Sequence, residues 1–138
     1  MGAIIVNRRS FISSALAIAS LPATMQAQEH PRIGLIFIGA SWCAVCHAAA
    51  SILAPAAEQS GLEILVASQD GKAIEPWTSF VDARGNPLTA EVKSIPTLLF
   101  VDLAEGKVIS RFEGFPGAPQ YLGMIRNTLR AAVEAGHG

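Results

Sequence analysis

An unbroken apolar run from Ile33 to Ile38 constrains the fold of this chain more than any other stretch. The run has the length of a strand and is rich in β-formers. Its apolar residues do not alternate with polar ones, which is typical of a strand buried on both faces. Residues 39–41 follow as a turn, in which Ser41 is a candidate helix cap. The run therefore predicts a buried strand that leads through a turn directly into a helix.

The next segment has the composition of a helix. Residues 43–59 are rich in Ala, Ile and Leu, and Gly61 is placed to end a helix there. Pro55 lies inside this segment and cannot donate to the carbonyl four residues earlier, so we expect a kink or a break at that point. A second apolar run follows at 62–67. Because such crossovers are right-handed, the two strands should be parallel.

The last third of the chain predicts a hairpin followed by a helix. The apolar run 98–101 and the alternating stretch 107–113 flank a turn, which indicates two antiparallel strands. From Gln120 onward apolar residues follow helical spacing, and we expect the tail 136–138 to be frayed. The predicted fold is α/β: a compact, central mixed sheet of about four strands, with a parallel strand–helix–strand unit and a C-terminal antiparallel hairpin, flanked by helices.

The segment 68–94 carries the weakest pattern. Trp77, Phe80 and Val81 are expected to be apolar anchors on a short helix or a packed loop. For Trp77 a packed aromatic ring is favoured over a ligand-stacking residue. Pro87 is placed to open a short helix that continues to Lys93.

The N-terminal residues resemble an export signal. Arg8 and Arg9 precede a mildly apolar, Ala- and Ser-rich stretch, and Ala27 is a small residue at the expected cut. These features describe a secretory signal peptide, and the arginine pair resembles the twin-arginine type. We therefore expect a cleaved signal at 1–27 and one domain at 28–138, which would be periplasmic in a Gram-negative-type bacterium and soluble after cleavage. The alternatives are an N-terminal helix of the fold and an uncleaved anchor.

Composition and cysteine usage narrow the function classes. The net charge of −1 offers no basic field for nucleic acid, and two cysteines cannot build a disulfide-rich scaffold. Both cysteines lie in the stretch 42–47, Trp-Cys-Ala-Val-Cys-His. A disulfide between them does not crosslink distant loops, but it can be reduced and reformed in a two-electron reaction. An exported protein also meets oxidising conditions, in which such a disulfide forms. The same letters spell C-x-x-C-H, the attachment site of a c-type haem.

The positions of the two cysteines predict different roles. Cys43 lies at the expected helix N-terminus, where unpaired N–H groups and the helix dipole lower the pKa of a thiol, whereas Cys46 lies one turn inside. Cys43 is therefore the candidate nucleophile, which forms a mixed disulfide with a substrate, and Cys46 is the candidate resolving thiol. Trp42 is expected to shield one side of the Cys43 sulfur. A protonated His47, four positions further on, would modestly favour the thiolate.

With these residues the chain resembles the exported bacterial thioredoxin-like proteins, a family of thiol-disulfide oxidoreductases. The matching features are the strand that leads into Ala-Ser-Trp, the C-x-x-C centre and the sequence Ile95-Pro96-Thr97 before a later strand. The resemblance implies a thioredoxin-like fold and a redox-active Cys43–Cys46 disulfide. It also implies a cis-proline at Pro96 that faces the cysteines, and a substrate chain bound by Ile95, Pro96 and Trp42. The implied partners are protein thiols or disulfides and a membrane electron donor or acceptor that recycles the pair, with no nucleic acid, no cofactor and no metal.

The sequence departs from this family in its redox dipeptide and at the position of its usual buried acid. The redox dipeptide is Ala44-Val45, which modulates the reduction potential and lacks the usual proline. The buried acid usual six residues before the first cysteine is Phe37 here. The direction of electron flow therefore stays open among reductant, oxidant and isomerase. The alternative class is a small carrier in which the two cysteines and His47 bind a c-type haem or copper.

Overall fold

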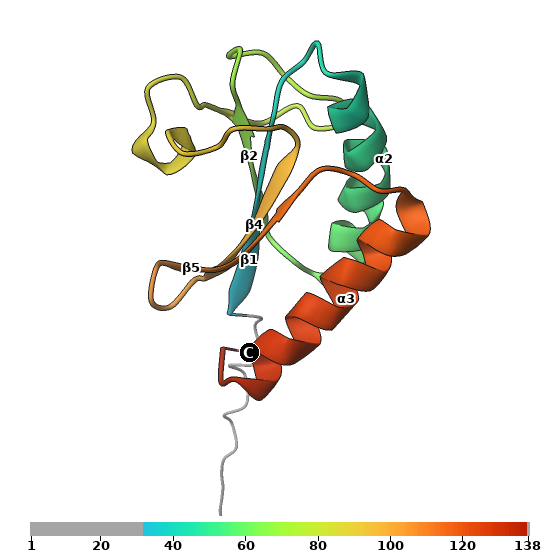
Figure 1. Cartoon of the computed structure of the whole chain (residues 1–138), viewed down its shortest axis with the longest axis vertical. Helices are drawn as coiled ribbons and strands as arrows, with labels where there is room; N and C mark the ends of the chain where they lie inside the picture. The colour runs from blue at the N-terminus through green and yellow to red at the C-terminus, as the bar shows by residue number, and fades with distance from the viewer. Residues whose placement is uncertain (1–31, 138) are drawn as a thin grey trace, which may run out of the picture. The chain divides into compact units, whose positions relative to one another are not determined.

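The computed structural model of the chain describes residues 32–137, so the predicted signal peptide lies outside the described residues. These residues form a five-stranded mixed sheet in the order β3-β2-β1-β4-β5, with two long helices (Figure 1). The elements in chain order are β1 (Ile33–Gly39), α2 (Ala44–Ser60), β2 (Ile64–Ser68), β3 (Val81–Asp82), a short 3₁₀ helix (Pro87–Thr89), β4 (Thr97–Asp102), β5 (Lys107–Glu113) and α3 (Ala118–Glu134).

Strand β1 lies at the centre of the sheet, and all of its residues except Ile36 are buried. On one side β2 pairs with it in parallel, with Leu35 opposite Ile64. On the other side β4 pairs with it antiparallel, with Ile38 opposite Thr97. The unbroken apolar run thus forms a strand covered on both faces, and the strand–helix–strand unit is parallel, as the sequence predicts.

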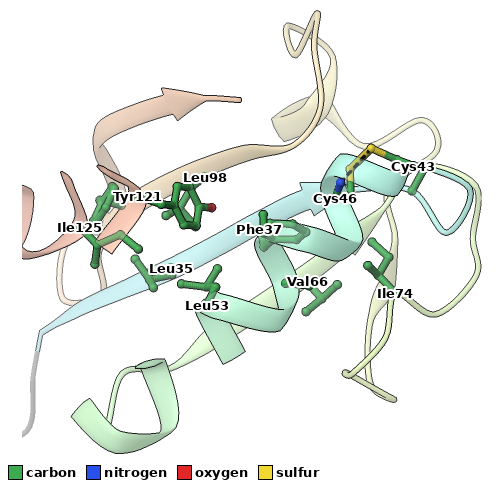
Figure 2. Close-up of a cluster of buried hydrophobic side chains, with 14 of the residues drawn as sticks. Leu35, Phe37, Cys43, Cys46, Leu53, Val66, Ile74, Leu98, Tyr121 and Ile125 are labelled. Carbon is green, nitrogen blue, oxygen red and sulfur yellow. Dashed lines mark hydrogen bonds between the residues drawn. A yellow bond between two sulfur atoms is a disulfide. The ribbon is translucent and has the colours of Figure 1, made fainter. Parts of the chain in front are cut away.

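The two faces of the sheet are covered differently. Figure 1 shows α2 and α3 on the same face. The larger core lies between these helices and the sheet, where Phe37 from β1, Leu53 from α2 and Leu98 from β4 are among its buried members (Figure 2). Side chains that alternate in direction along the strands form a smaller cluster on the other face. Its buried members are Ile38, Ala67, Ala83 and Leu99.

Helix α2 runs without a break through Pro55, so the break allowed for at this position does not occur. Pro55 and Ser51, whose carbonyl loses its usual donor, both lie on the exposed side of the helix, where water can replace that donor. The helix ends at Gly61, which adopts φ 70° and donates its N–H to the carbonyls of Ala57 and Glu58. A left-handed residue here favours glycine, as the sequence indicates.

Segment 68–94 differs from its prediction in three respects. It contributes a fifth strand, β3, whose residues pair in parallel with the end of β2. A two-residue edge strand with two exposed side chains leaves no periodic pattern in a sequence, which is why the expected sheet had about four strands. Phe80 and Val81 are exposed rather than anchors, and the helix expected up to Lys93 is only the 3₁₀ turn at Pro87–Thr89.

The C-terminal tail is not frayed up to His137, contrary to the expectation. The His137 N–H donates to the Ala132 carbonyl at 2.9 Å, which turns the chain back after α3. The imidazole Nδ1 then lies 2.7 Å from Oδ2 of the buried Asp102 at the end of β4. Helical spacing alone does not reveal this contact, because the partner lies 35 residues earlier in the chain.

Candidate active site

The cysteine pair lies at the turn from β1 into α2, where Figure 2 shows the disulfide at the start of the helix. Cys43 is the N-cap of α2, with an extended backbone at φ −91° and ψ 109°. The Cα atoms of Cys43 and Cys46 are 5.1 Å apart, within the usual range for a disulfide. The backbone N–H of Cys46 donates to the Cys43 sulfur at 3.1 Å. The same donor would stabilise a Cys43 thiolate after reduction.

The two sulfur-bearing residues differ in exposure. Cys43 keeps 8% of its surface exposed, whereas Cys46 is fully buried. A close approach by Gly39 at the end of β1 contributes to this burial, because a Cβ at this position would lie 3.0 Å from the Cys46 sulfur. Solvent therefore reaches the pair only from the Cys43 side, which is the asymmetry that the predicted roles require.

The residues around the cysteines form an open, partly apolar surface. Trp42 is 72% exposed, Val45 is 49% exposed, and Ala44 is also exposed. None of these side chains is needed to fill the core. They are therefore free to contact a partner that reaches Cys43.

Ile95 and Pro96 lie at the same edge of the sheet as the cysteines. Thr97, the next residue, pairs with Ile38 at the end of β1, close in sequence to the turn that carries Cys43. The Ile95–Pro96 peptide bond is cis, the isomer that the resemblance implies. Pro96 is fully buried and Ile95 is half-buried, and the Pro96 carbonyl accepts from the Gly114 N–H at 2.7 Å.

A polar unit beside the cysteines was not found from the sequence. Ser41 does not cap α2; its hydroxyl and its N–H instead donate to the carboxylate of Asp70, which follows β2. The Asp70 carboxylate also accepts from the Ser68 hydroxyl at 2.8 Å and from the Lys72 N–H at 3.4 Å. These donors, with the Ser41 hydroxyl first, hold the pKa of Asp70 well below its usual range. Asp70 therefore carries a fixed negative charge beside the turn.

His47 lies on the other side of this turn. Its Nε2 is 2.6 Å from the Ser41 carbonyl oxygen, so the ring holds the start of the turn. Ser41 is thus bound through its N–H and hydroxyl by Asp70 and through its carbonyl by His47. One signal in the sequence could have indicated this unit: Asp70 follows the second of two parallel strands, and the ends of such strands meet at one edge of a sheet.

The space behind the cysteines is apolar. Phe37 is fully buried, and its ring lies 5.1 Å from the ring of Trp77. This contact confirms Trp77 as a packed aromatic. Figure 2 shows Phe37 beneath the first turn of α2, near Cys46. The Asp70 carboxylate therefore lies beside the turn, bound to Ser41, while apolar side chains lie beneath the disulfide.

Within residues 32–137 no group of three or more His, Cys, Asp or Glu side chains is placed to bind a metal ion. Over the same residues no helix is both long and apolar enough to cross a bilayer.

Solved structures with a similar fold are thioredoxins and related proteins. The pneumococcal exposed lipoprotein thioredoxin Etrx1 of Streptococcus pneumoniae is 24% identical with a TM-score of 0.54, over 71% of this chain and 86% of that one. A Chlorobium tepidum protein assigned as thiol:disulfide interchange protein DsbE is 21% identical with a TM-score of 0.53, over 81% and 84%. Fasciola hepatica thioredoxin is 22% identical with a TM-score of 0.50, over 73% and 81%. At these identities the similarity establishes the fold.

The fold, together with the disulfide-bonded C-x-x-C pair at the start of α2, defines a protein of the thioredoxin-like fold class, which confirms the fold inferred from the sequence. More narrowly, the chain belongs to the TraF family, described as F plasmid transfer operon protein, whose model matches residues 22–115. No curated protein matches the chain.

Proposed function

We propose that this protein is an exported thiol-disulfide oxidoreductase that exchanges its Cys43–Cys46 pair with thiols and disulfides of other proteins. Cys43 attacks the substrate disulfide, and Cys46 resolves the mixed disulfide. Residues 1–27 form a cleaved twin-arginine signal, and 28–138 form the periplasmic domain. A membrane protein donates or accepts the electrons that recycle the pair.

The observation that carries this proposal is the asymmetry of the disulfide at the start of α2. Only Cys43 is reached by solvent, and only Cys43 receives the N–H of the first helical turn. A thiolate there is both accessible and stabilised, which is what an attacking cysteine needs. The exposed Trp42 and the half-buried Ile95 provide contacts for a substrate chain, and the buried Pro96 fixes the backbone beside them. Ala44, Val45 and His47 modulate the pair.

The haem or copper carrier is the weaker alternative. Attachment of a haem uses both cysteine sulfurs and a histidine on the iron. Cys46 is fully buried against β1, and the His47 Nε2 contacts the Ser41 carbonyl. An absorption spectrum of the purified protein separates the classes, because a haem band that survives denaturation would contradict the oxidoreductase proposal.

A trapping experiment tests the roles of the cysteines. Cys46→Ala should accumulate mixed disulfides with cellular proteins, because the resolving thiol is missing, and the adducts should disappear on reduction. Cys43→Ala is the matched control and should trap few or none. Adducts found mainly with Cys43→Ala would reverse the roles. Adducts with neither variant, together with a wild-type protein that cannot reduce or oxidise a model protein disulfide, would contradict the proposed activity.

Export is tested separately in the full chain. Replacing Arg8 and Arg9 with lysine keeps the charge but removes the arginine pair, so the shortened protein should disappear from the periplasmic fraction. Arg32→Lys, outside the expected signal, is the matched control. Unchanged processing in the paired variant would argue against the twin-arginine route.

A further inference from the structure

The Asp70 carboxylate is held in one place beside the redox pair. Four donors converge on it: the N–H and the hydroxyl of Ser41, the hydroxyl of Ser68 and the N–H of Lys72. Ser41 lies two residues before Cys43, and the Cys43 N–H donates back to the Ala40 carbonyl at 3.2 Å, which closes the turn between them. The carboxylate is therefore tied to the backbone segment that carries the nucleophile.

Two side chains of opposite charge, Arg84 and Asp82, interact with Asp70 and largely offset each other. Arg84 and Asp82 lie against Gly71, but they pair with each other, with Nε 2.9 Å from Oδ1, so together they add little net charge. His47 contacts Ser41 from the other side, through the carbonyl. Because the donors keep the pKa of Asp70 low, the carboxylate is ionised across the working pH range.

A fixed negative charge acts on the two redox states unequally. The disulfide is neutral, whereas the reduced pair carries a thiolate at Cys43, which the carboxylate repels. This repulsion raises the free energy of the reduced pair relative to the disulfide. A less stable reduced form gives up its electrons more readily.

We propose that Asp70 is a positioning residue that lowers the reduction potential of the Cys43–Cys46 pair and so biases the protein towards donating electrons. In that direction the Cys43 thiolate attacks a substrate disulfide and displaces one substrate thiolate. Cys46 then forms the intramolecular disulfide and releases the second substrate thiol, so two electrons pass to the substrate. This inference rests on the proposed function and gives it a direction.

The test measures the equilibrium of the purified protein with defined glutathione redox buffers. Asp70→Asn removes the charge but keeps one oxygen acceptor, and it should raise the equilibrium constant for reduction by glutathione about three- to tenfold. Glu63→Gln is the matched control, because it removes one exposed negative charge just before β2, at the end of that strand remote from Asp70, and it should stay within about twofold of wild type. Repeating the comparison in a His47→Gln background separates the effect of the Asp70 carboxylate on the equilibrium constant from that of the His47 imidazole.

Circular dichroism shows whether Asp70→Asn folds, and a second variant tests the inference if it does not. Ser41→Ala releases the carboxylate from the turn and should shift the constant in the same direction by a smaller factor. If Asp70→Asn folds and its equilibrium constant for reduction by glutathione is unchanged or lower, the inference is wrong while the proposed function stands. If Asp70→Asn does not fold, the same result in Ser41→Ala has the same consequence. A wild-type pair that does not exchange with glutathione at all overturns the proposed function and this inference with it.

Discussion

Asp102 connects the end of β4, the turn after it and the C-terminal tail, and its removal should destabilise the protein strongly. The carboxylate is buried and accepts from the N–H groups of Ala104 and Glu105 at 2.9 Å each, while the His137 Nδ1 lies 2.7 Å away. Hydrogen bonds to a charged group contribute about 1.5–3 kcal/mol each, but exposed turn N–H groups recover part of this from water. We therefore expect the free energy of unfolding to fall by about 3 kcal/mol in Asp102→Ala and by about 1 kcal/mol in His137→Ala.

Urea denaturation at neutral pH, followed by circular dichroism, measures these losses. Asp102→Asn is an informative intermediate because it keeps an oxygen for the turn N–H groups but loses the charge, and we expect about 2 kcal/mol. The double variant Asp102→Asn/His137→Ala should lose less than the sum of its parts, since the two residues are in contact. Additive losses, or a His137→Ala variant as stable as wild type, would refute the contact and restore the frayed tail that the sequence predicts.

The same pair predicts how stability depends on pH. His137 first, and then the Glu105 N–H, lower the pKa of Asp102 in the folded protein. A carboxylate with a lowered folded pKa stabilises the fold fully above its unfolded pKa, about 3.9, and loses this contribution as the pH falls towards the folded value. As the pH falls below about 5, the free energy of unfolding should therefore decrease more for the wild type than for Asp102→Asn. The extra decrease should be about as large as the difference in stability between the two proteins at neutral pH. Parallel pH profiles for the two proteins would contradict this.

Three further outcomes are expected. Tyr121 is the single tyrosine of the sequence and burial raises its pKa, so an absorbance titration should show no tyrosinate near pH 10 while the fold persists; ionisation there would contradict its burial. Its hydroxyl is buried with no hydrogen-bond partner among the described residues, so Tyr121→Phe should raise the free energy of unfolding by about 1 kcal/mol, and a loss would indicate a hidden partner. Gly39→Ala places a Cβ 3.0 Å from the Cys46 sulfur, so it should destabilise the disulfide form by about 1–3 kcal/mol and slow resolution; wild-type turnover would refute that close approach.

The central part of the fold follows from local sequence patterns. The run from Ile33 to Ile38 is apolar at every position except Gly34. Such a run is typical of a strand whose two faces are both buried, because alternate side chains point to opposite faces. Cys43 and Cys46 are likewise visible because their spacing and the turn before them are local. Pro96 could be placed only by resemblance, since nothing in its own sequence neighbourhood distinguishes a cis bond from a trans bond.

The parts that escaped prediction depend on contacts between residues far apart in the chain. Ser41 has the chemistry of a helix cap, yet its hydroxyl is drawn to Asp70, 29 residues later. His137 follows a helix as an unremarkable tail residue, yet it meets a buried carboxylate. Val81 looks like a core residue, but it lies in an edge strand too short to bury it. In each case the local sequence is compatible with more than one conformation, and a contact with a distant part of the chain determines which one forms.

The position of Phe37 decides which residues can control the redox pair. A carboxylate in its place would sit in a fully buried, aromatic environment beside Trp77, where an unpaired charge is strongly disfavoured. The Asp70 carboxylate lies instead after β2, bound to Ser41 of the turn that leads into Cys43. If this division holds, Phe37→Leu should reduce stability by about 1 kcal/mol and leave the reduction potential unchanged, whereas Asp70→Asn should shift the potential. If Phe37→Leu shifted the reduction potential as much as Asp70→Asn does, the apolar side chains beneath the disulfide, and not Asp70, would control that potential.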